Sequence, residues 1–208
     1  MPVDLLYPTP IYFDLTNDTN IHTEIQKAVD NEKFEYNDWW GKTHQLSSDG
    51  NVIKKYKMEY FQAWLDTCLV EYYHSLNRTL LEVNNEYKIE SWIALFNPND
   101  YAHIHSHGHA DISGVFYHTT NNEDGDIWFE NPVIQTEQSL SYTQEVVKYP
   151  PQKGKLIMFP GYMKHGVLRN QTQDTRVSLS FNIYFPKKIQ CKTCCRTQWR
   201  ISSICNFI

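Results

Sequence analysis

Residues 165–178 read HGVLRNQTQDTRVS, so that ten residues separate His165 from Arg176, and Ser178 follows two positions later. A second dense stretch lies upstream, where residues 103–111 read HIHSHGHAD and contain four histidines. Imidazoles are good ligands for divalent transition metals, and an arginine fork binds a carboxylate through two parallel charged hydrogen bonds. Together the two stretches indicate a metal ion held beside an anionic co-substrate.

Short runs typical of strands surround both stretches from residue 89 onward. Turn formers such as the Asn-Pro pair at 131–132 and the Pro-Gly pair at 160–161 separate them. Eight short strands at this spacing predict a double-stranded β-helix, the jelly-roll or cupin-like core of a mainly β protein with flanking helices. The expected strands are 89–97, 103–108, 112–118, 126–130, 141–148, 155–159, 164–169 and 175–185.

The part of the chain before the strands predicts helical support for this core. Residues 5–15 are expected to form an entry strand, confined to a sheet edge or a strand start by Pro8 and Pro10. Residues 20–34 predict a helix that Asn20 caps. Apolar residues at three- and four-residue spacings make 56–84 the strongest helical pattern in the chain.

The chain is expected to form one domain over residues 1–186, because no repeat or linker divides it. Helical support occupies 20–84, with a polar loop at 35–55, and the jelly-roll core occupies 89–186. A cysteine-rich tail follows at 187–208, without strand or helix periodicity.

Composition excludes several classes of protein. The formal net charge is −5 and no basic patch stands out, so a nucleic-acid footprint is not supported. The apolar runs are far too short to cross a membrane. The N-terminus has neither the basic nor the apolar region of a secretory signal, which favours a cytoplasmic location. The sequence leaves the oligomeric state open, with a homodimer as one option.

The cysteines point to a reducing compartment with free thiols, because their number is odd and no signal peptide is apparent. Cys68 falls on the predicted helix and is interpreted as a small core residue. The other four lack the paired spacing of a zinc ribbon, so a zinc site is not the preferred interpretation. They are Cys191, Cys194, Cys195 and Cys205.

Strand geometry offers a way to bring the metal ligands together. Side chains alternate along a strand, so His105 and His107 share one face, as do His103 and His109. His165, from an opposing strand of a closed roll, supplies a third ligand. Three ligands on one side of an ion leave positions open for small molecules.

The same alternation places Arg176 and Ser178 on one face of the last strand. Arg176 is expected to grip the far carboxylate of a dicarboxylic co-substrate, and the Ser178 hydroxyl is expected to donate to the same group. Tyr117, one strand away, adds a phenolic hydrogen bond, and Asn182 supports the strand that carries Arg176.

Several blocks in this order resemble the Fe(II)/2-oxoglutarate-dependent dioxygenase superfamily, and more narrowly a family of 2-oxoglutarate–Fe(II) oxygenases of bacteria and phages with a prolyl-hydroxylase-like layout. The blocks are 7–12 (YPTPIY), 91–92 (SW), 105–107 (HSH), 113–117 (SGVFY), 129–132 (FENP), 151–160 (PQKGKLIMFP), His165 and 176–182 (RVSLSFN). They span most of residues 5–186. If phage-encoded, the protein is expected in the host cytoplasm.

One position departs from the superfamily pattern, which pairs His-x-Asp or His-x-Glu with a distal histidine. At the aligned position this chain has His105-x-His107, without a carboxylate. The preferred ligand set is therefore His105, His107 and His165. A literal His-x-Asp does occur at His109 and Asp111, close to the next expected strand, and these two are the rival ligands.

The resemblance implies an enzyme that uses Fe(II), 2-oxoglutarate and O2 to hydroxylate a small molecule or a peptidyl residue, with succinate and CO2 as co-products. Trp92 and Tyr101 are candidate substrate contacts at the mouth of the site. Two alternatives stay open: a three-histidine cupin dioxygenase that does not use 2-oxoglutarate, and a non-catalytic jelly-roll module that binds a metal or a sugar.

Overall fold

The computed structural model describes residues 9–38, 41–76, 87–133 and 146–186. The expected cysteine-rich tail lies outside these ranges, as do residues 141–145 of the expected strand 141–148. The helices are α1 (Thr19–Asn31), α2 (Val52–Lys55) and α3 (Glu59–Ser75). The strands are β1 (Tyr12–Leu15), β2 (Phe34–Tyr36), β3 (Gln45–Ser47), β4 (Lys88–Phe96), β5 (Ala102–His105), β6 (Ile112–Thr119), β7 (Ile127–Glu130), β8 (Val146–Tyr149), β9 (Lys155–Pro160), β10 (His165–Val167) and β11 (Arg176–Tyr184).

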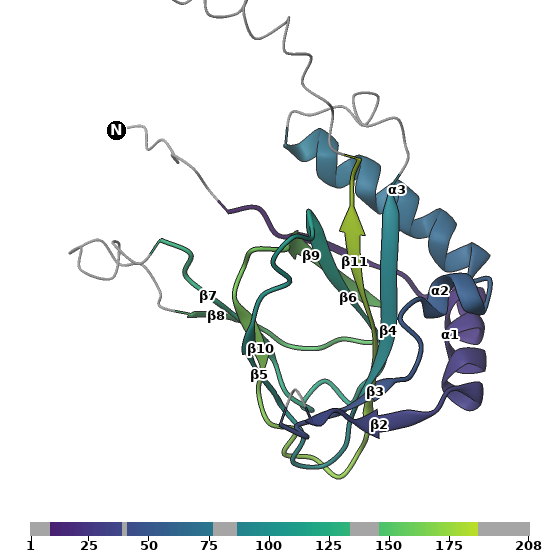
Figure 1. Cartoon of the computed structure of the whole chain (residues 1–208), viewed down its shortest axis with the longest axis vertical. Helices are drawn as coiled ribbons and strands as arrows, with labels where there is room; N and C mark the ends of the chain where they lie inside the picture. The colour runs from purple at the N-terminus through teal and green to yellow at the C-terminus, as the bar shows by residue number, and fades with distance from the viewer. Residues whose placement is uncertain (1–8, 39–40, 77–86, 134–145, 187–208) are drawn as a thin grey trace, which may run out of the picture.

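Two antiparallel sheets form the core and confirm the predicted jelly roll. The larger sheet has the order β1-β9-β6-β11-β4-β3-β2, and the smaller has the order β5-β10-β7-β8. The eight strands expected from residue 89 onward correspond to β4 through β11. Figure 1 shows the smaller sheet on one side of the larger and the helices on the other. The interior between the sheets is therefore lined by both.

The helices cover the outer face of the larger sheet with their apolar stripes. Ile21 and Ile25 of α1 and Phe61 and Leu65 of α3 are fully buried, in one cluster with Phe181 of β11. Asp18, rather than the expected Asn20, caps α1, since its carboxylate accepts from the backbone N–H of Asn20 at 2.8 Å. Cys68 is a buried core residue of α3, as predicted.

The prediction of a polar loop over residues 35–55 is wrong. This segment contains most of β2, all of β3 and α2. Strand β3 extends the larger sheet, where Leu46 is the register partner of Ala94 on β4. The strand is too short for its periodicity to stand out, and its pairing with β4 spans about fifty positions. No helix in the described ranges is long and apolar enough to span a membrane.

Two strand pairings position the site. On the smaller sheet, β10 pairs with β5 so that His165 is the register partner of His105. On the larger sheet, β11 lies between β4 and β6, and Ser178 is the register partner of Tyr117. The histidine stretch and the arginine strand therefore face each other across the interior of the roll.

Candidate metal and anion site

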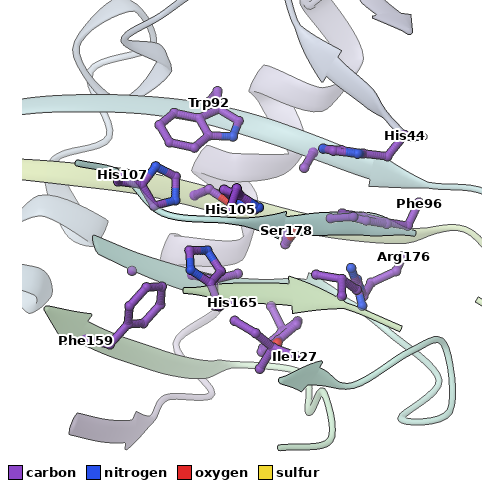
Figure 2. Close-up of a pocket in the computed structure, with 17 residues that line it drawn as sticks. His44, Trp92, Phe96, His105, His107, Ile127, Phe159, His165, Arg176 and Ser178 are labelled. Atoms are coloured by element: carbon purple, nitrogen blue, oxygen red, sulfur yellow. The ribbon is translucent and has the colours of Figure 1, made fainter. Parts of the chain in front are cut away.

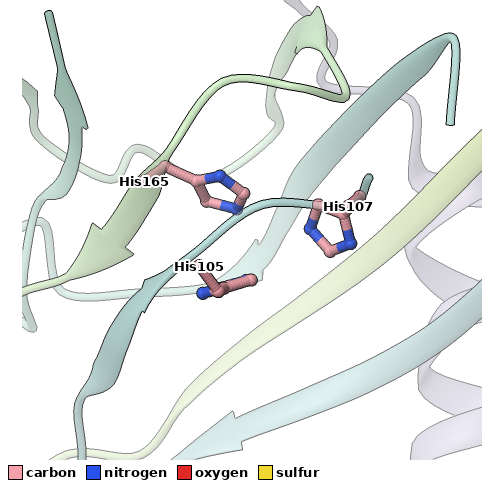
Figure 3. A group of neighbouring side chains, drawn as sticks. All are labelled: His105, His107 and His165. Carbon is pink, nitrogen blue, oxygen red and sulfur yellow. The ribbon is translucent and has the colours of Figure 1, made fainter. Parts of the chain in front are cut away.

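Three histidines converge between the sheets (Figure 3). His105, His107 and His165 each offer one ring nitrogen, and the three nitrogens lie within 4.8 Å of one another. The ring centroids of His105 and His165 are 4.3 Å apart, and that of His107 is 5.1 Å from each. In the described ranges this is the one cluster of at least three potential ligands. It is the preferred set of the sequence analysis.

The route by which His107 reaches the cluster differs from the expected one. Strand β5 ends at His105, so strand alternation does not place His107 on the same face. His107 lies in the turn that follows, where its backbone N–H donates to the carbonyl of Gly161 at 2.9 Å. The predicted residues come together, but the second ligand comes from a loop held against the 160–163 turn.

The cluster is built from uncharged imidazoles. All three rings have a lowered pKa, and burial is the largest cause in each. The pKa of His107 falls to about 4, that of His165 falls well below its ordinary value, and that of His105 is also lowered. Two rings are also oriented by the backbone, because Nδ1 of His105 faces the carbonyl of His103 at 2.8 Å and Nδ1 of His165 faces that of Met163 at 3.0 Å. At neutral pH these rings have lone pairs available for a metal ion.

Arg176 forms the other end of the site and is almost completely buried, with 1% of its surface exposed. Its Nη1 donates to the carbonyls of Gly125 at 2.6 Å and Asp124 at 3.3 Å. Its Nε is buried and has no hydrogen-bond partner, and no carboxylate of the described residues lies within ion-pair distance of the guanidinium. The carboxylates of Asp124 and Asp126 act on the guanidinium electrostatically without pairing with it. A buried charge without a direct ion pair is costly, so this end of the pocket fits an anion.

The Gly125 turn that anchors Arg176 requires glycine. Its φ is +103°, a conformation that L side chains rarely adopt, and an added Cβ would lie 2.3 Å from the carbonyl oxygen of Leu168. The turn thereby brings two backbone carbonyls against one edge of the guanidinium. The buried Nε atom, by contrast, has no hydrogen-bond partner among the described residues.

An aromatic stack holds the flat face of the guanidinium. The Cζ of Arg176 lies 4.0 Å from the centroid of the Phe96 ring, and on Phe96 the imidazole of His44 stacks at 4.6 Å with an interplanar angle of 5°. Burial lowers the pKa of His44 to about 4. Sequence reasoning missed both residues, because His44 falls in the segment assigned to a loop and nothing distinguishes Phe96 from the other apolar residues of the expected strand 89–97.

One pocket contains both ends of the site (Figure 2). Its empty space, including the open mouth, is about 550 Å³. The predicted residues His105, His107, His165, Arg176, Ser178, Tyr117 and Trp92 all line it. Burial raises the pKa of Tyr117 to about 12, so its hydroxyl keeps its proton and stays a donor.

Other predicted residues lie elsewhere. His109 and Asp111 are exposed, and the Asp111 carboxylate accepts from the backbone N–H of Phe185 at 2.7 Å, so the structure does not bring the rival ligands to His165. Tyr101 does not line the pocket; its ring packs against Arg169. Asn182 lies at the end of β11 remote from Arg176, and its amide contacts His107.

The donor set fits the groups that the sequence resemblance implied. Imidazole suits iron, nickel, copper and zinc, and a facial set of three leaves coordination positions free. A buried guanidinium with an unpaired nitrogen suits a carboxylate. A small molecule with an anionic group at its far end therefore fits between the histidines and Arg176.

Comparison with known proteins agrees with this geometry. Residues 90–182 match the sequence model of a family described as "Putative 2OG-Fe(II) oxygenase". None of the curated proteins matches the sequence.

Solved structures of similar fold are numerous, at low sequence identity. A prolyl-4-hydroxylase from Pseudomonas putida is 12% identical with a TM-score of 0.57, over 84% of this chain and 92% of that chain. The α-ketoglutarate-dependent epimerase SnoN of nogalamycin biosynthesis is 10% identical with a TM-score of 0.60, over 88% and 83%. HygX from Streptomyces hygroscopicus, solved with nickel and 2-oxoglutarate, is 10% identical with a TM-score of 0.57, over 86% and 84%.

At these identities the structural neighbours establish the fold alone, whereas the family model covers the strands that carry every residue of the converging site from β4 to β11. Residues 90–182 thus match the 2-oxoglutarate–Fe(II) oxygenase family, and the resemblance found in the sequence is confirmed.

Proposed function

We propose that this protein is an Fe(II)- and 2-oxoglutarate-dependent oxygenase that hydroxylates a small molecule or a peptidyl residue. One observation carries the proposal: a single pocket joins three converging imidazole nitrogens to a buried arginine whose Nε has no partner among the described residues. When bound, Fe(II), 2-oxoglutarate and O2 supply the oxidising chemistry, with succinate and CO2 as co-products.

In this proposal His105, His107 and His165 hold the iron. Their burial keeps the rings uncharged at neutral pH, so metal binding displaces no proton from an imidazolium. The contacts of His105 and His165 with backbone carbonyls fix the ring orientation before the metal arrives. Such preorganisation lowers the entropic cost of assembling the site.

Arg176 binds the far carboxylate of 2-oxoglutarate and sets its orientation. Its position is fixed on three sides, by the Asp124 and Gly125 carbonyls and by the Phe96 ring, so little side-chain entropy is lost on binding. The hydroxyls of Ser178 and Tyr117, register partners on β11 and β6, donate to the same carboxylate. The keto-acid end is left facing the histidines.

The substrate approaches on the side of the metal site where Trp92 lies. The ring centroids of Trp92 and His107 are 5.8 Å apart and both residues line the pocket, which places the indole beside the metal site where it can contact a substrate. The structural neighbours include a prolyl-4-hydroxylase and an epimerase of nogalamycin biosynthesis, which supports either a peptidyl or a small-molecule substrate. We further propose that the protein works in the cytoplasm as a single domain over residues 1–186.

Anaerobic titration tests the proposal directly. Fe(II) and 2-oxoglutarate, added together to the metal-free protein without oxygen, are expected to produce the weak visible charge-transfer band of the chelate. Admission of oxygen is then expected to convert 2-oxoglutarate to succinate. Arg176→Ala should lose the band at 2-oxoglutarate concentrations that saturate the unaltered protein. A band of unchanged intensity and affinity in that variant would disprove the role given to Arg176.

A second enzymatic function takes its support from the ligand set. Three histidines without a carboxylate also suit a cupin dioxygenase that does not use 2-oxoglutarate. Such an enzyme has no need of Arg176, and it forms no succinate. The buried guanidinium therefore favours the 2-oxoglutarate enzyme, and succinate formation separates the two.

A non-catalytic jelly-roll module that binds a metal or a sugar is the third reading of the same pocket. It predicts metal binding without oxygen consumption under any combination of 2-oxoglutarate and iron. An oxygen-electrode measurement with both added distinguishes it from the two enzymes.

A further inference from the structure

The three converging histidines differ in what faces their Nδ1 atoms. Those of His105 and His165 face backbone carbonyls, which only accept, so each Nδ1 carries the ring proton and Nε2 keeps the lone pair. His107 has a different neighbour, because its Nδ1 lies 3.3 Å from the side-chain amide nitrogen of Asn182, whose amide oxygen accepts from the Ser113 hydroxyl. An amide has a donor end and an acceptor end, so it does not fix the tautomer by its presence alone.

The orientation of the Asn182 amide determines which nitrogen of His107 carries the ring proton. Figure 3 shows one ring nitrogen of His107 pointing toward His105 and His165 and the other pointing away. Since Nδ1 is the atom beside Asn182, Nε2 is the one that points into the cluster. If the amide nitrogen donates to Nδ1, the neutral ring carries its proton on Nε2, where a metal would bind. If the amide oxygen accepts from Nδ1–H, Nε2 is free.

Ser113 makes both orientations of the amide possible. Its hydroxyl lies 2.8 Å from the amide oxygen of Asn182, and both residues are buried, at 1% and 6% exposed. A serine hydroxyl donates and accepts, so it can satisfy either end of the amide. Rotation of the amide by half a turn exchanges two ends of nearly equal size and places the oxygen against His107.

We propose that Asn182, supported by Ser113, is the positioning residue that selects the metal-binding tautomer of His107. The inference rests on the proposed three-histidine metal site, and it goes further by making one ligand conditional on a side chain. With the Asn182 oxygen toward Nδ1, the third nitrogen joins the metal site. With the amide nitrogen of Asn182 toward Nδ1, Nε2 of His107 carries the ring proton and does not bind the metal.

Metal titration of variants tests this role without an activity assay. Metal-free protein is titrated with Co(II) under anaerobic conditions, and affinity is measured together with the visible spectrum, which responds to the number and type of ligands. Asn182→Leu removes the acceptor at similar size and is expected to weaken Co(II) binding about 10- to 100-fold, the usual effect of losing an outer-shell partner. Its spectrum should change toward fewer nitrogen ligands.

Asn182→Asp supplies an acceptor in either orientation. This variant is expected to bind Co(II) at least as tightly as the unaltered protein, with the same spectrum. Asn170→Leu is the matched control, because Asn170 is another buried asparagine and hydrogen-bonds the backbone of Phe96 and Asp174 instead of a ligand. It should lower the free energy of unfolding and leave the Co(II) affinity unchanged.

Each outcome decides a separate point. Unchanged affinity and spectrum in Asn182→Leu would overturn the inference, and so would an Asn182→Asp protein that binds Co(II) more weakly than the unaltered one. Should the leucine variant not fold, the aspartate variant alone decides. Failure of the unaltered protein to bind Co(II) would instead refute the proposed metal site.

Discussion

Two groups of buried histidines in this fold have similar ring distances and pKa shifts but differ in the hydrogen bonds of their ring nitrogens. The first is the cluster of His105, His107 and His165 between the sheets. The second is a pair, His22 of α1 and His118 of β6, with ring centroids 5.1 Å apart and Nδ1 atoms 3.0 Å apart. Burial is the largest cause of a lowered pKa in every one of these rings. Proximity and pKa therefore do not separate the two groups.

Their hydrogen bonds do separate them. The amide nitrogen of Gln26 donates to Asp30 at 2.7 Å, so the amide oxygen of Gln26 faces Nε2 of His118 at 2.9 Å and accepts a hydrogen bond from Nε2–H. The Nδ1 of His118 is then left to accept from Nδ1–H of His22. In the pair, the lone pair of His118 Nδ1 accepts the hydrogen bond that joins α1 to the sheet. In the cluster, one nitrogen of each ring points toward a common centre.

The largest expected effect is on metal binding. His165→Ala should abolish Mn(II) or Co(II) binding at concentrations that saturate the unaltered protein, because a two-histidine remnant lacks the facial set. His118→Gln is the matched control from the second group and should bind the metal as the unaltered protein does. Calorimetric titration measures both, and equal loss in the two variants would erase the distinction between the groups.

The anion end should respond next. Arg176→Ala is expected to weaken 2-oxoglutarate binding by about 3 kcal/mol, or roughly 100-fold, the scale of losing charged hydrogen bonds in a buried site. Arg176→Lys keeps the charge but loses the planar fork, so its 2-oxoglutarate affinity should lie between those of the unaltered protein and Arg176→Ala. Metal binding without 2-oxoglutarate should stay intact in both variants. A parallel loss of metal binding would show that the two ends are not separable.

A moderate effect on stability is expected from the pair. His118→Leu leaves Nδ1 of His22 and the oxygen of Gln26 without their partner and should lower the free energy of unfolding by about 1–3 kcal/mol. Urea unfolding of metal-free protein measures the change. An unaltered midpoint would mean that the pair does not fasten α1 to β6.

The smallest effect is a pH dependence of stability. The folded-state pKa of His118 is lowered to about 4 from an ordinary 6.5, chiefly by burial and then by His22 and Lys153, with Asp30 opposing. The unfolded chain therefore binds a proton between these values while the folded chain does not. The free energy of unfolding should fall as pH drops from 6.5 toward 4, and His118→Gln should reduce this slope in metal-free protein. A slope that the substitution leaves unchanged would contradict the assignment.

Much of the fold was predictable because its information is local. Turn formers at regular spacing predicted β4 through β11. The site was predicted from the order along the chain of the histidine stretch, His165 and Arg176. Strand β3 and helix α2 were not predictable in this way. Both depend on distant partners, as when the Ser91 hydroxyl accepts from the backbone N–H of Ile53.

The site shows the same division. Residue identity and spacing were enough to select His165, Arg176 and Ser178, and the family resemblance favoured His105 and His107 among the upstream histidines. The stack of His44 on Phe96 and the contact of Asn182 with His107 required the coordinates, because nothing near either residue in the sequence names its partner. Asp111 illustrates the reverse case, since a suggestive His-x-Asp spacing ended in a backbone hydrogen bond.

The absence of a carboxylate among the converging ligands has an electrostatic consequence. With uncharged imidazoles, Arg176 is the one formally charged side chain among the described residues that line the pocket. A divalent ion held there keeps its whole charge, so the loaded pocket is one unit more positive than a pocket in which an aspartate or glutamate takes part. In a space of low permittivity, that surplus favours an electron-rich or anionic guest over a cationic one.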